Sequence, residues 1–302
     1  MKQMDIGNHN VLVIVVTYNA ASYIRQCLSS IDIDAFDVLV VDNNSKDNTI
    51  QIIKNEFPKV IISAQLINLG FGQANNIGLQ KAITEDYDYV LLLNQDAWVK
   101  PDTLSKLIES SRSNPAFWIL SPIQYHSGIN DIEPQFKKYL NRYNIKLQKK
   151  SVQEMLFANA AVWLISRNCI HKVGGFDPIF PHYGEDDDYI NRVYAKGGKL
   201  GIVTSAVAYH DRNLNSAPSD FKRIVYLTKL SYLNKLKKQN GKFSSNIIRM
   251  LSYSALKFFR ALGKGNIRLA SARLIAGIKA ISQIREVYFH REMSKNDMAF
   301  LK

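Results

Sequence analysis

The sequence is poor in cysteine and lacks long apolar runs. Only two cysteines, Cys27 and Cys169, occur in 302 residues, and they do not form a CxxC pair. This excludes a disulfide framework and a thiolate metal site, and it is typical of the reducing cytoplasm. No apolar run approaches the roughly 20 residues of a membrane-spanning helix, and the N-terminus lacks the layout of a secretory signal. We therefore expect a cytoplasmic protein.

Acidic residues are scarce in the last quarter of the chain. Residues 221–302 hold 18 lysines and arginines against three acidic residues, whereas the two signs nearly balance over residues 1–220. Such a change of composition predicts a domain boundary near residue 220. The chain also lacks the GxGxxG fingerprint of dinucleotide-binding domains and the GxxxxGK[ST] phosphate loop.

Short apolar runs alternate with helix-like segments along the chain. This alternation predicts an α/β fold in which helices flank a mostly parallel, doubly wound sheet. The expected strands are 11–17, 37–42, 60–67, 89–93, 160–166 and 201–209. The expected helices are 21–30, one capped near Ser45 or Asp47, 72–82, one beginning at Pro101, and 187–196. Residues 123–153 are polar and basic, and we expect a mobile loop or lid there.

Polar side chains follow four of the expected strands, at residues 17–19, 42–45, 68 and 94–96. In a parallel sheet, ligands bind beyond the carboxyl ends of the strands. Gly70 and Gly72 would let the backbone approach a ligand closely, and the asparagines offer amide groups to a base or a ribose. The sequence therefore predicts a ligand site at this edge of the sheet.

Two acidic features suggest chemistry at that edge. Asp96 follows a buried strand, and a carboxylate there is costly unless it binds something, such as Mg²⁺ or Mn²⁺ held together with phosphates and water. Residues 185–188 read Glu-Asp-Asp-Asp, and crowding of like charges raises the pKa of a carboxyl group toward that of a general base. The alternatives are that Asp96 caps a turn and that the acidic run is the solvated first turn of a helix.

Taken in order, these segments resemble the family 2 glycosyltransferases of the GT-A fold, particularly the rhamnosyltransferase-like enzymes of bacterial surface polysaccharide synthesis. The resemblance covers about residues 10–212. It rests on segments 13–19, 40–45, 68–78, 92–96, 174–177 and 184–188. It implies a Rossmann-like GT-A catalytic domain at 1–220, with a nucleotide-sugar half at about 1–115 and an acceptor half at about 116–220.

The resemblance also implies roles for particular residues. Asp186 matches the catalytic base, and Glu185 and Asp188 would contact the acceptor. Asp42 would accept a hydrogen bond from a pyrimidine base. The implied nucleotide-binding residues are Thr17, Tyr18, Asn19, Asp42, Asn44, Asn68, Gly70, Asn75, Asn94 and Gln95.

A metal site is implied as well, with Mg²⁺ or Mn²⁺ as the cofactor. Asp96 matches the last acid of the family's Asp-x-Asp motif. Asn94 replaces the first acid, which leaves a weaker ligand or a sugar contact in its place. His210 would be a further metal ligand, and the alternative is an ordinary packed histidine at the end of a strand.

The implied reaction is a single displacement that inverts the anomeric carbon. Asp186 would deprotonate the acceptor hydroxyl, while the metal neutralises charge on the leaving diphosphate. The transition state should have oxocarbenium character. We expect a dTDP- or UDP-sugar as donor, and a glycan or lipid-linked glycan as acceptor.

The basic region at 221–302 carries apolar and aromatic residues at helical spacing, which predicts about three helices. Basic amphipathic helices suit an anionic membrane surface, so we expect peripheral docking at the inner face of the membrane. The alternative is a helical cap packed on the catalytic domain.

Three other classes of protein share single features with this sequence. A nucleic-acid-binding protein would explain the basic region, but no such module is recognisable, so we expect no nucleic acid partner. A nucleotidyltransferase would show a glycine-rich phosphate loop near the N-terminus. A glycosidase would use paired carboxylates without a nucleotide pocket.

Overall fold

The computed structural model describes residues 10–126, 131–148, 152–211 and 220–301. Its centre is a nine-stranded sheet in the order β3-β2-β1-β4-β8-β6-β9-β5, with β7 beside β9. The strands are β1 (Val11–Thr17), β2 (Asp37–Asp42), β3 (Ile61–Ala64), β4 (Tyr89–Asn94), β5 (Ala97–Val99), β6 (Phe117–Tyr125), β7 (Val152–Glu154), β8 (Val162–Ser166) and β9 (Lys199–His210).

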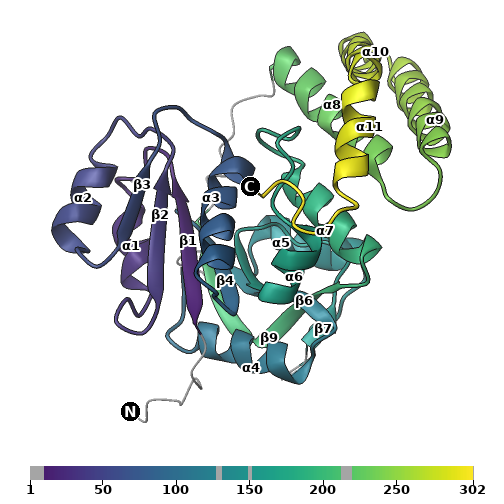
Figure 1. The fold of residues 1–302 in the computed structure, drawn as a ribbon. Helices are drawn as coiled ribbons and strands as arrows, with labels where there is room; N and C mark the ends of the chain where they lie inside the picture. Colours follow the sequence, from purple (N-terminus) through teal and green to yellow (C-terminus); the bar gives the residue numbers. More distant parts are fainter. Residues whose placement is uncertain (1–9, 127–130, 149–151, 212–219, 302) are drawn as a thin grey trace.

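Helices cover both faces of this sheet, and four more stand beside it (Figure 1). β1 pairs in parallel with β2 and β4, and β2 with β3, whereas β8 runs antiparallel to β4. The mostly parallel sheet confirms the predicted α/β fold. The helices are α1 (Ile24–Ser29), α2 (Thr49–Glu56), α3 (Phe71–Thr84), α4 (Thr103–Ser113), α5 (Pro134–Arg142), α6 (Arg167–Val173), α7 (Glu185–Ala195), α8 (Phe221–Lys237), α9 (Phe243–Leu262), α10 (Ile267–Ser282) and α11 (Ile284–Met293).

β1 illustrates why these segments form central strands. Its residues, VLVIVVT, are nearly all β-branched and suit a pleated backbone. Leu12 and Ile14 join the core shared with α3, while Val13 and Val15 join the core shared with α1 and α2. A strand covered on both faces requires such an uninterrupted apolar run, and its polar groups then collect at its carboxyl end.

The prediction of a mobile loop at 123–153 is wrong for the part of this segment that the structure describes. The segment contains the end of β6, helix α5 and strand β7. Phe136, Tyr139 and Leu140 are buried in the core, at the spacing of one helical face. The Glu133 side chain accepts a hydrogen bond from the Phe136 backbone and caps the helix. Residues 127–130 and 149–151 of the expected lid lie outside the described residues.

The basic C-terminal region forms four helices, α8 to α11, where about three were predicted. They share a core cluster with Ile179 and Phe180, which precede α7. In Figure 1 these helices stand as one group beside the α7 side of the sheet. Among the described residues, none of the helices has both the length and the hydrophobicity needed to cross a bilayer.

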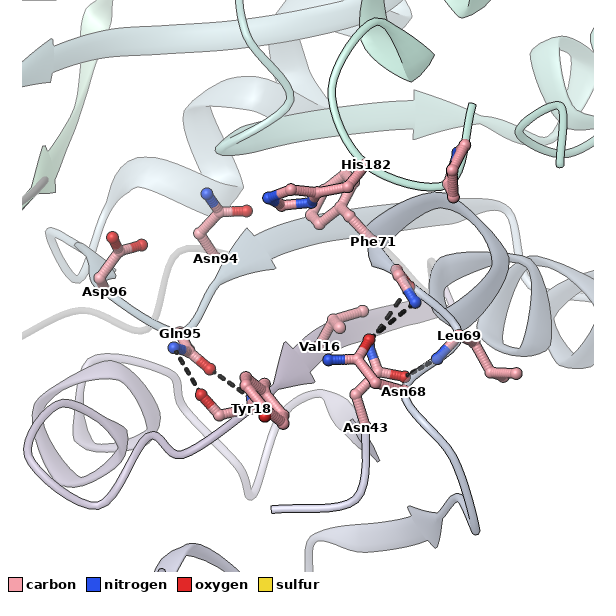
Figure 2. Close-up of a pocket in the computed structure, with 12 residues that line it drawn as sticks. Val16, Tyr18, Asn43, Asn68, Leu69, Phe71, Asn94, Gln95, Asp96 and His182 are labelled. Carbon is pink, nitrogen blue, oxygen red and sulfur yellow. Dashed lines mark hydrogen bonds between the residues drawn. The ribbon is translucent and has the colours of Figure 1, made fainter. Parts of the chain in front are cut away.

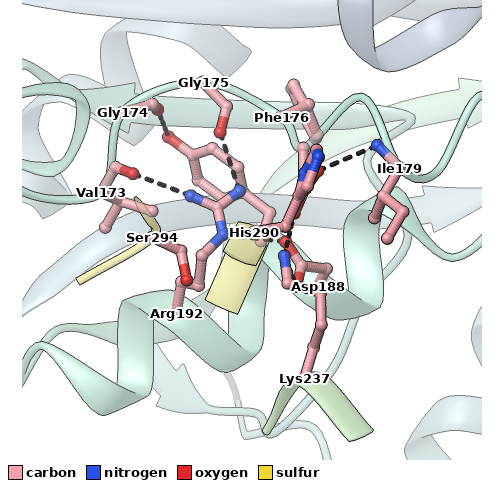
Figure 3. A network of polar contacts seen from close by, with 12 residues as sticks. Val173, Gly174, Gly175, Phe176, Ile179, Asp188, Arg192, Lys237, His290 and Ser294 are labelled. Carbon is pink, nitrogen blue, oxygen red and sulfur yellow. Dashed lines mark hydrogen bonds and ion pairs between the residues drawn. The ribbon is translucent and has the colours of Figure 1, made fainter. Parts of the chain in front are cut away.

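A buried ionic network joins this helical group to the rest of the protein (Figure 3). Lys237 on α8 pairs with Asp177 and, at 2.8 Å, with Asp188. His290 Nδ1 lies 2.5 Å from Asp177 Oδ1, and Arg192 Nε donates to Asp188 Oδ2 at 2.8 Å. Three of these carboxylate contacts come from α8 and α11. These buried ion pairs therefore join the helical group to α7 and to the loop before it.

The last described residues return to the sheet domain. The Met298 backbone N–H donates to the His171 carbonyl at 2.8 Å, and the Gly175 N–H donates to the Ala299 carbonyl at 2.7 Å. Leu301 packs against the core cluster that contains α3 and α6 residues. The chain therefore closes against α6 after passing through the helical group (Figure 1).

Candidate active site

A cavity of about 630 Å³ opens beyond the carboxyl ends of β1, β2 and β4 (Figure 2). Its position is the one predicted from the polar residues that follow these strands. Its lining residues are Val16, Tyr18, Asn43, Asn68, Leu69, Gly70, Phe71, Asn94, Gln95, Asp96, Pro181 and His182. Six of the twelve predicted nucleotide and metal residues are therefore brought together here.

Thr17 and Asp42 lie behind the cavity wall. Both are fully buried, and the Thr17 hydroxyl donates to Asp42 Oδ1 at 2.8 Å. Asp42 also accepts from the Ser45 backbone N–H and from the Ser45 hydroxyl. Three protein hydrogen bonds thus occupy the carboxylate expected to face a pyrimidine. In this structure Asp42 shapes the loop after β2 and does not line the cavity.

Asn19, Asn44 and Asn75 also do not line the cavity. Asn19 and Asn44 have positive φ angles, 50° and 65°, which Asn tolerates in tight turns. Their side-chain oxygens accept hydrogen bonds from Lys46. Asn75 is buried in α3, where its amide donates to the Phe71 carbonyl at 3.0 Å. These three asparagines therefore fix local backbone geometry.

Asn43 lines the cavity. It belongs to the polar segment 42–45 that the sequence placed at this edge, but it was not among the residues implied to bind the nucleotide. Its side chain accepts from the Leu69 N–H and donates to the Gly70 carbonyl, each at 3.2 Å. It thereby joins the end of β2 to the turn before α3 (Figure 2). Its place directly after Asp42 indicated a position at the strand end. Because adjacent side chains along a strand point to opposite sides, Asn43 faces the cavity while Asp42 faces away from it.

Gly70 allows the segment 181–182, which was not predicted as part of the site, to lie against the cavity. Its φ is +80°, and a Cβ there would lie 1.9 Å from the Pro181 carbonyl oxygen. Only glycine permits this close approach. As a result Pro181 and His182, which are distant in sequence from Gly70, form part of the cavity wall.

Gln95 and Tyr18 join the ends of β4 and β1. Gln95 Oε1 accepts from the Tyr18 N–H at 2.7 Å, and its amide donates to the Tyr18 carbonyl at 3.3 Å. The Tyr18 side chain borders the cavity and the residue is 48% exposed. Its ring is therefore available to a flat ligand group.

Asp96 and His210 form a pair suited to a metal ion. His210 Nε2 lies 3.3 Å from Asp96 Oδ1, because β5 and β9 place Ala97 opposite His210. Two ligands that share an ion at about 2.1 Å stand about 3 Å apart. Among the described residues, no group of three or more His, Cys, Asp or Glu side chains could hold a metal. A metal ion here would take Asp96 and His210 as its protein ligands, and phosphates and water would complete its coordination.

A smaller chamber of about 160 Å³ adjoins the main cavity, and Phe71, Asn94 and His182 line both. Its other walls are Asn159, Ala160, Ala161, Tyr183, Glu185 and Asp186. The chamber thus extends from the end of β4 to the beginning of α7. Asn159 is a further residue that the sequence analysis missed.

The predicted acidic residues of α7 have different surroundings. Glu185 is 6% exposed, and burial, followed by the charge of Asp186, raises the pKa of Glu185 to about 8. Asp186 is less buried and also lines the chamber. Asp188 is buried between Arg192 and Lys237, so the structure places it in the ionic network and away from the predicted acceptor site.

Doubly wound sheets bind their ligands, nucleotides among them, in cavities beyond the strand ends, as the cavities here are placed. The family model for glycosyl transferase family 2 matches residues 12–174. Because this match covers more than half of the chain, the protein belongs to glycosyl transferase family 2.

Two curated relatives are similar at low identity. One is the N-acetylglucosaminyl-diphospho-decaprenol L-rhamnosyltransferase of Mycobacterium tuberculosis, 24% identical over 233 residues that cover 66% of this chain and 75% of the relative. The other is the poly(ribitol-phosphate) beta-N-acetylglucosaminyltransferase TarS of Staphylococcus aureus. It is 24% identical over 247 residues, which cover 74% of this chain and 40% of TarS.

Solved structures share the GT-A fold. S. aureus TarS 1-349 in complex with UDP-GlcNAc aligns with a TM-score of 0.57 and 17% identity, covering 95% of this chain and 84% of that one. GalNAc-T7 with UDP, GalNAc and Mn2+ aligns with a TM-score of 0.56 and 15% identity, covering 78% and 52%. The fold and the family confirm the resemblance seen in the sequence.

Proposed function

We propose that this glycosyltransferase inverts the anomeric carbon and uses a metal ion, moving a hexose from a dTDP- or UDP-sugar to a glycan or lipid-linked glycan in bacterial surface polysaccharide synthesis. The observation that carries the proposal is the pair of joined cavities. Asp96, which pairs with the buried His210, borders one end, and Asp186 lies at the other.

The nucleoside diphosphate fits the larger cavity. Tyr18 offers its ring to the base, and Asn43 and Asn68 lie beside the glycine turn at Gly70. The sugar then extends past Asn94 into the small chamber. This placement brings the anomeric carbon between the diphosphate and the beginning of α7.

Asp186 is the proposed base. It lines the chamber, so an acceptor hydroxyl that enters from the α7 side can lose its proton to this carboxylate. Glu185 is unsuitable at neutral pH because its raised pKa, about 8, keeps it protonated. Attack from one face with departure of the diphosphate from the other inverts the anomeric carbon.

The metal would be held by Asp96 and His210. When bound, a divalent cation supplies positive charge to the leaving diphosphate. An imidazole ligand suits a transition ion better than Mg²⁺, so we propose Mn²⁺ as the preferred cofactor. Gln95 fixes the loop that carries Asp96 by its two hydrogen bonds to Tyr18.

The acceptor is proposed to approach along a groove of about 740 Å³ between α7 and α8. Tyr183 lines both this groove and the small chamber. Lys235 and Lys238 line the groove. The Lys235 ammonium lies 3.9 Å from the centroid of the Tyr253 ring, and the charge of Lys238 acts on Asp187. Two similar proteins are named for phosphate-bearing acceptors, a diphospho-decaprenol and a poly(ribitol-phosphate), and two such cations suit an acceptor of that class.

Membrane docking is proposed for α9 and α10. Each presents exposed apolar residues at helical spacing, within a region of 18 basic and three acidic residues. They are Ile248, Leu251, Phe259 and Leu262 on α9, and Ile267, Leu274, Ile278 and Ile281 on α10. Sedimentation with phosphatidylglycerol vesicles at low salt, but not with phosphatidylcholine vesicles, supports docking on an anionic membrane surface, as we propose for the inner face of the membrane. If the protein binds neither kind of vesicle, α8 to α11 are a helical cap packed on the catalytic domain.

Thermal stabilisation by nucleotides tests the central proposal. A pyrimidine diphosphate or its sugar should raise Tm, and more so with Mn²⁺ than without it. UDP, dTDP, GDP and their sugars form the panel, and the nucleotide that stabilises most identifies the donor class. If no nucleotide changes Tm, with or without metal, the proposed donor site is wrong.

A further inference from the structure

The small chamber contains buried polar atoms that the protein itself leaves without a partner. Asn159 is 5% exposed, and neither its Oδ1 nor its Nδ2 has a hydrogen-bond partner among the described residues. The same is true of Asn94 Oδ1 and Glu185 Oε2. All three side chains line the same cavity. Native proteins rarely keep such groups unpaired unless a ligand or water completes them.

The position of Asn159 is fixed by the sheet. It stands shortly before β8, which pairs with β4 through Leu93 and Val162. The Asn94 backbone N–H donates to the Ala161 carbonyl at 2.9 Å, so the segment around Asn159 is tied to the end of β4. An amide on so rigid a support can discriminate between ligands because it cannot move to satisfy a wrong one.

The chamber has the size and chemistry of a site for one sugar ring. Its volume of about 160 Å³ equals that of about five water molecules at ~30 Å³ each. Phe71, Ala160 and Ala161 supply apolar walls. An amide both donates and accepts, as a sugar hydroxyl does, and a protonated Glu185 can also donate.

We propose that Asn159 is a specificity-determining residue that reads a hydroxyl or acetamido group of the transferred sugar. This inference rests on the proposed function. The substrate class is a nucleoside diphosphate sugar with a polar substituent facing Asn159, and a sugar that is deoxy at that carbon leaves the amide unpaired and is rejected.

A binding role and a structural role of Asn159 predict different effects of its removal on Tm. A structural asparagine makes hydrogen bonds to its own protein, and its removal lowers stability. Asn159 makes none to a described residue, so Asn159→Ala should leave the ligand-free Tm unchanged or raise it. A drop of several degrees contradicts the proposal.

The test is calorimetric titration of wild type and Asn159→Ala with UDP, dTDP, UDP-N-acetylglucosamine, UDP-galactose and dTDP-rhamnose. The matched control is Asn55→Ala, which removes an exposed amide on α2. In Asn159→Ala, the sugar nucleotide that wild type binds best should lose about tenfold or more in affinity. The affinity for the same nucleotide without its sugar should match that of wild type and of the control.

Two outcomes overturn the inference in distinguishable ways. An unchanged ratio between sugar nucleotide and nucleotide affinities in Asn159→Ala removes Asn159 from sugar recognition and leaves the proposed function standing. A wild-type protein that binds none of the five probes removes the donor site itself, and the inference falls with it.

Discussion

The carboxyl groups at the beginning of α7 show how strongly a few ångströms of position decide a residue's chemistry. Glu185 is buried beside Asp186, and burial raises its pKa to about 8. Asp188, one helical turn further on, is neutralised by Arg192 and Lys237. The acidic run was predicted from sequence as one feature, yet its four members differ. Glu185 is a neutral acid, Asp186 a chamber-lining carboxylate and Asp188 an ion-paired carboxylate. Desolvation by the surrounding protein, followed by the charge of Asp186, raises the pKa of Asp187 to about 7.

Asp186→Asn should lower kcat by about 10²–10⁴-fold, because the amide cannot accept the acceptor's proton. Glu185→Gln should reduce kcat less than tenfold at pH 7, because it imitates the protonated acid already present. Steady-state rates with the donor found by thermal stabilisation provide the measurement. The reverse order of effects would assign the base to Glu185.

The pH dependence follows from the same pair. The pKa of Glu185 is raised to about 8, so its neutral form persists below that pH and a buried negative charge appears above it. Wild-type activity should change as the pH rises through 8, whereas Glu185→Gln should lack this transition. Identical pH profiles for the two proteins would show that Glu185 does not titrate there.

His210→Gln should raise the Mn²⁺ concentration needed for half-maximal activity by about tenfold or more, because one of two protein ligands is lost. The imidazole is buried, its Nε2 faces Asp96, and its Nδ1 has no partner among the described residues. His171→Gln, on the surface of α6, is the matched control. A metal titration that coincides with wild type would return His210 to the packed-histidine alternative.

At the scale of elements, the strands β1, β2 and β4 were predicted well, whereas β5, β6 and β7 were not predicted. β1 and β2 have the predicted bounds because each is an apolar run between polar turns. β3 ends at Ala64, three residues before the predicted end, because the chain turns toward the cavity. β6 was missed although its sequence, FWILSPIQY, is mostly apolar, because Pro122 interrupts the run. α5 was expected as a loop, since Lys137, Lys138 and Asn141 mask its narrow apolar face. Pairing partners such as the antiparallel β8 cannot be read from local sequence at all.

Gly78→Ala should destabilise the protein by about 1–3 kcal/mol, although alanine is the better helix former. A Cβ at Gly78 would lie 2.3 Å from Ile14 Cδ1 and 2.6 Å from Ile14 Cγ1, so α3 could not pack as closely on β1. Urea unfolding measures the difference. Gly263→Ala, where a Cβ meets nothing closer than 3.5 Å, is the control and should be neutral. Equal stabilities for the two variants would mean that Ile14 yields without cost.

The groove between α7 and α8 gives a prediction for the acceptor. Lys235→Gln combined with Lys238→Gln should raise the KM for a phosphate-bearing acceptor several-fold and leave the donor KM unchanged. Lys222→Gln combined with Lys279→Gln removes the same charge from a different cavity of the helical group. Similar acceptor KM values for both double variants would exclude a specific role for the groove.

At the scale of the whole molecule, the composition change at residue 220 predicted where the helical group begins. It did not predict which residues attach this group to the rest of the protein. The domain boundary remains a prediction, and Ile179, Phe180 and the buried ionic network join the helical group to the rest of the chain. Lys237 was counted only as one of the basic residues, and the sequence analysis assigned nothing to His290, yet both side chains pair with Asp177 in the interior. Long-range pairs of this kind leave no local pattern.

Asp177 should make stability depend on acid pH. Burial alone would raise its pKa, but the hydrogen bond from His290 and the charge of Lys237 hold the pKa of Asp177 at about 2. The contribution is therefore complete above pH 4 and is lost as the pH falls through 2, amounting to about 2 kcal/mol. Urea unfolding between pH 5 and 2 checks this. Asp177→Asn should show a smaller slope there, and equal slopes would contradict the assignment.

The contact of residues 298–301 with α6 has a consequence for how the protein is made. A ribosome releases the sheet domain first, at about 5–20 residues per second, and the helical group only afterwards. The core beside α3 and α6 stays incomplete until Leu301 has emerged, because that side chain packs into it. We therefore expect a nascent chain paused in α9 or α10 to leave the surface of α6 that contacts residues 298–301 uncovered.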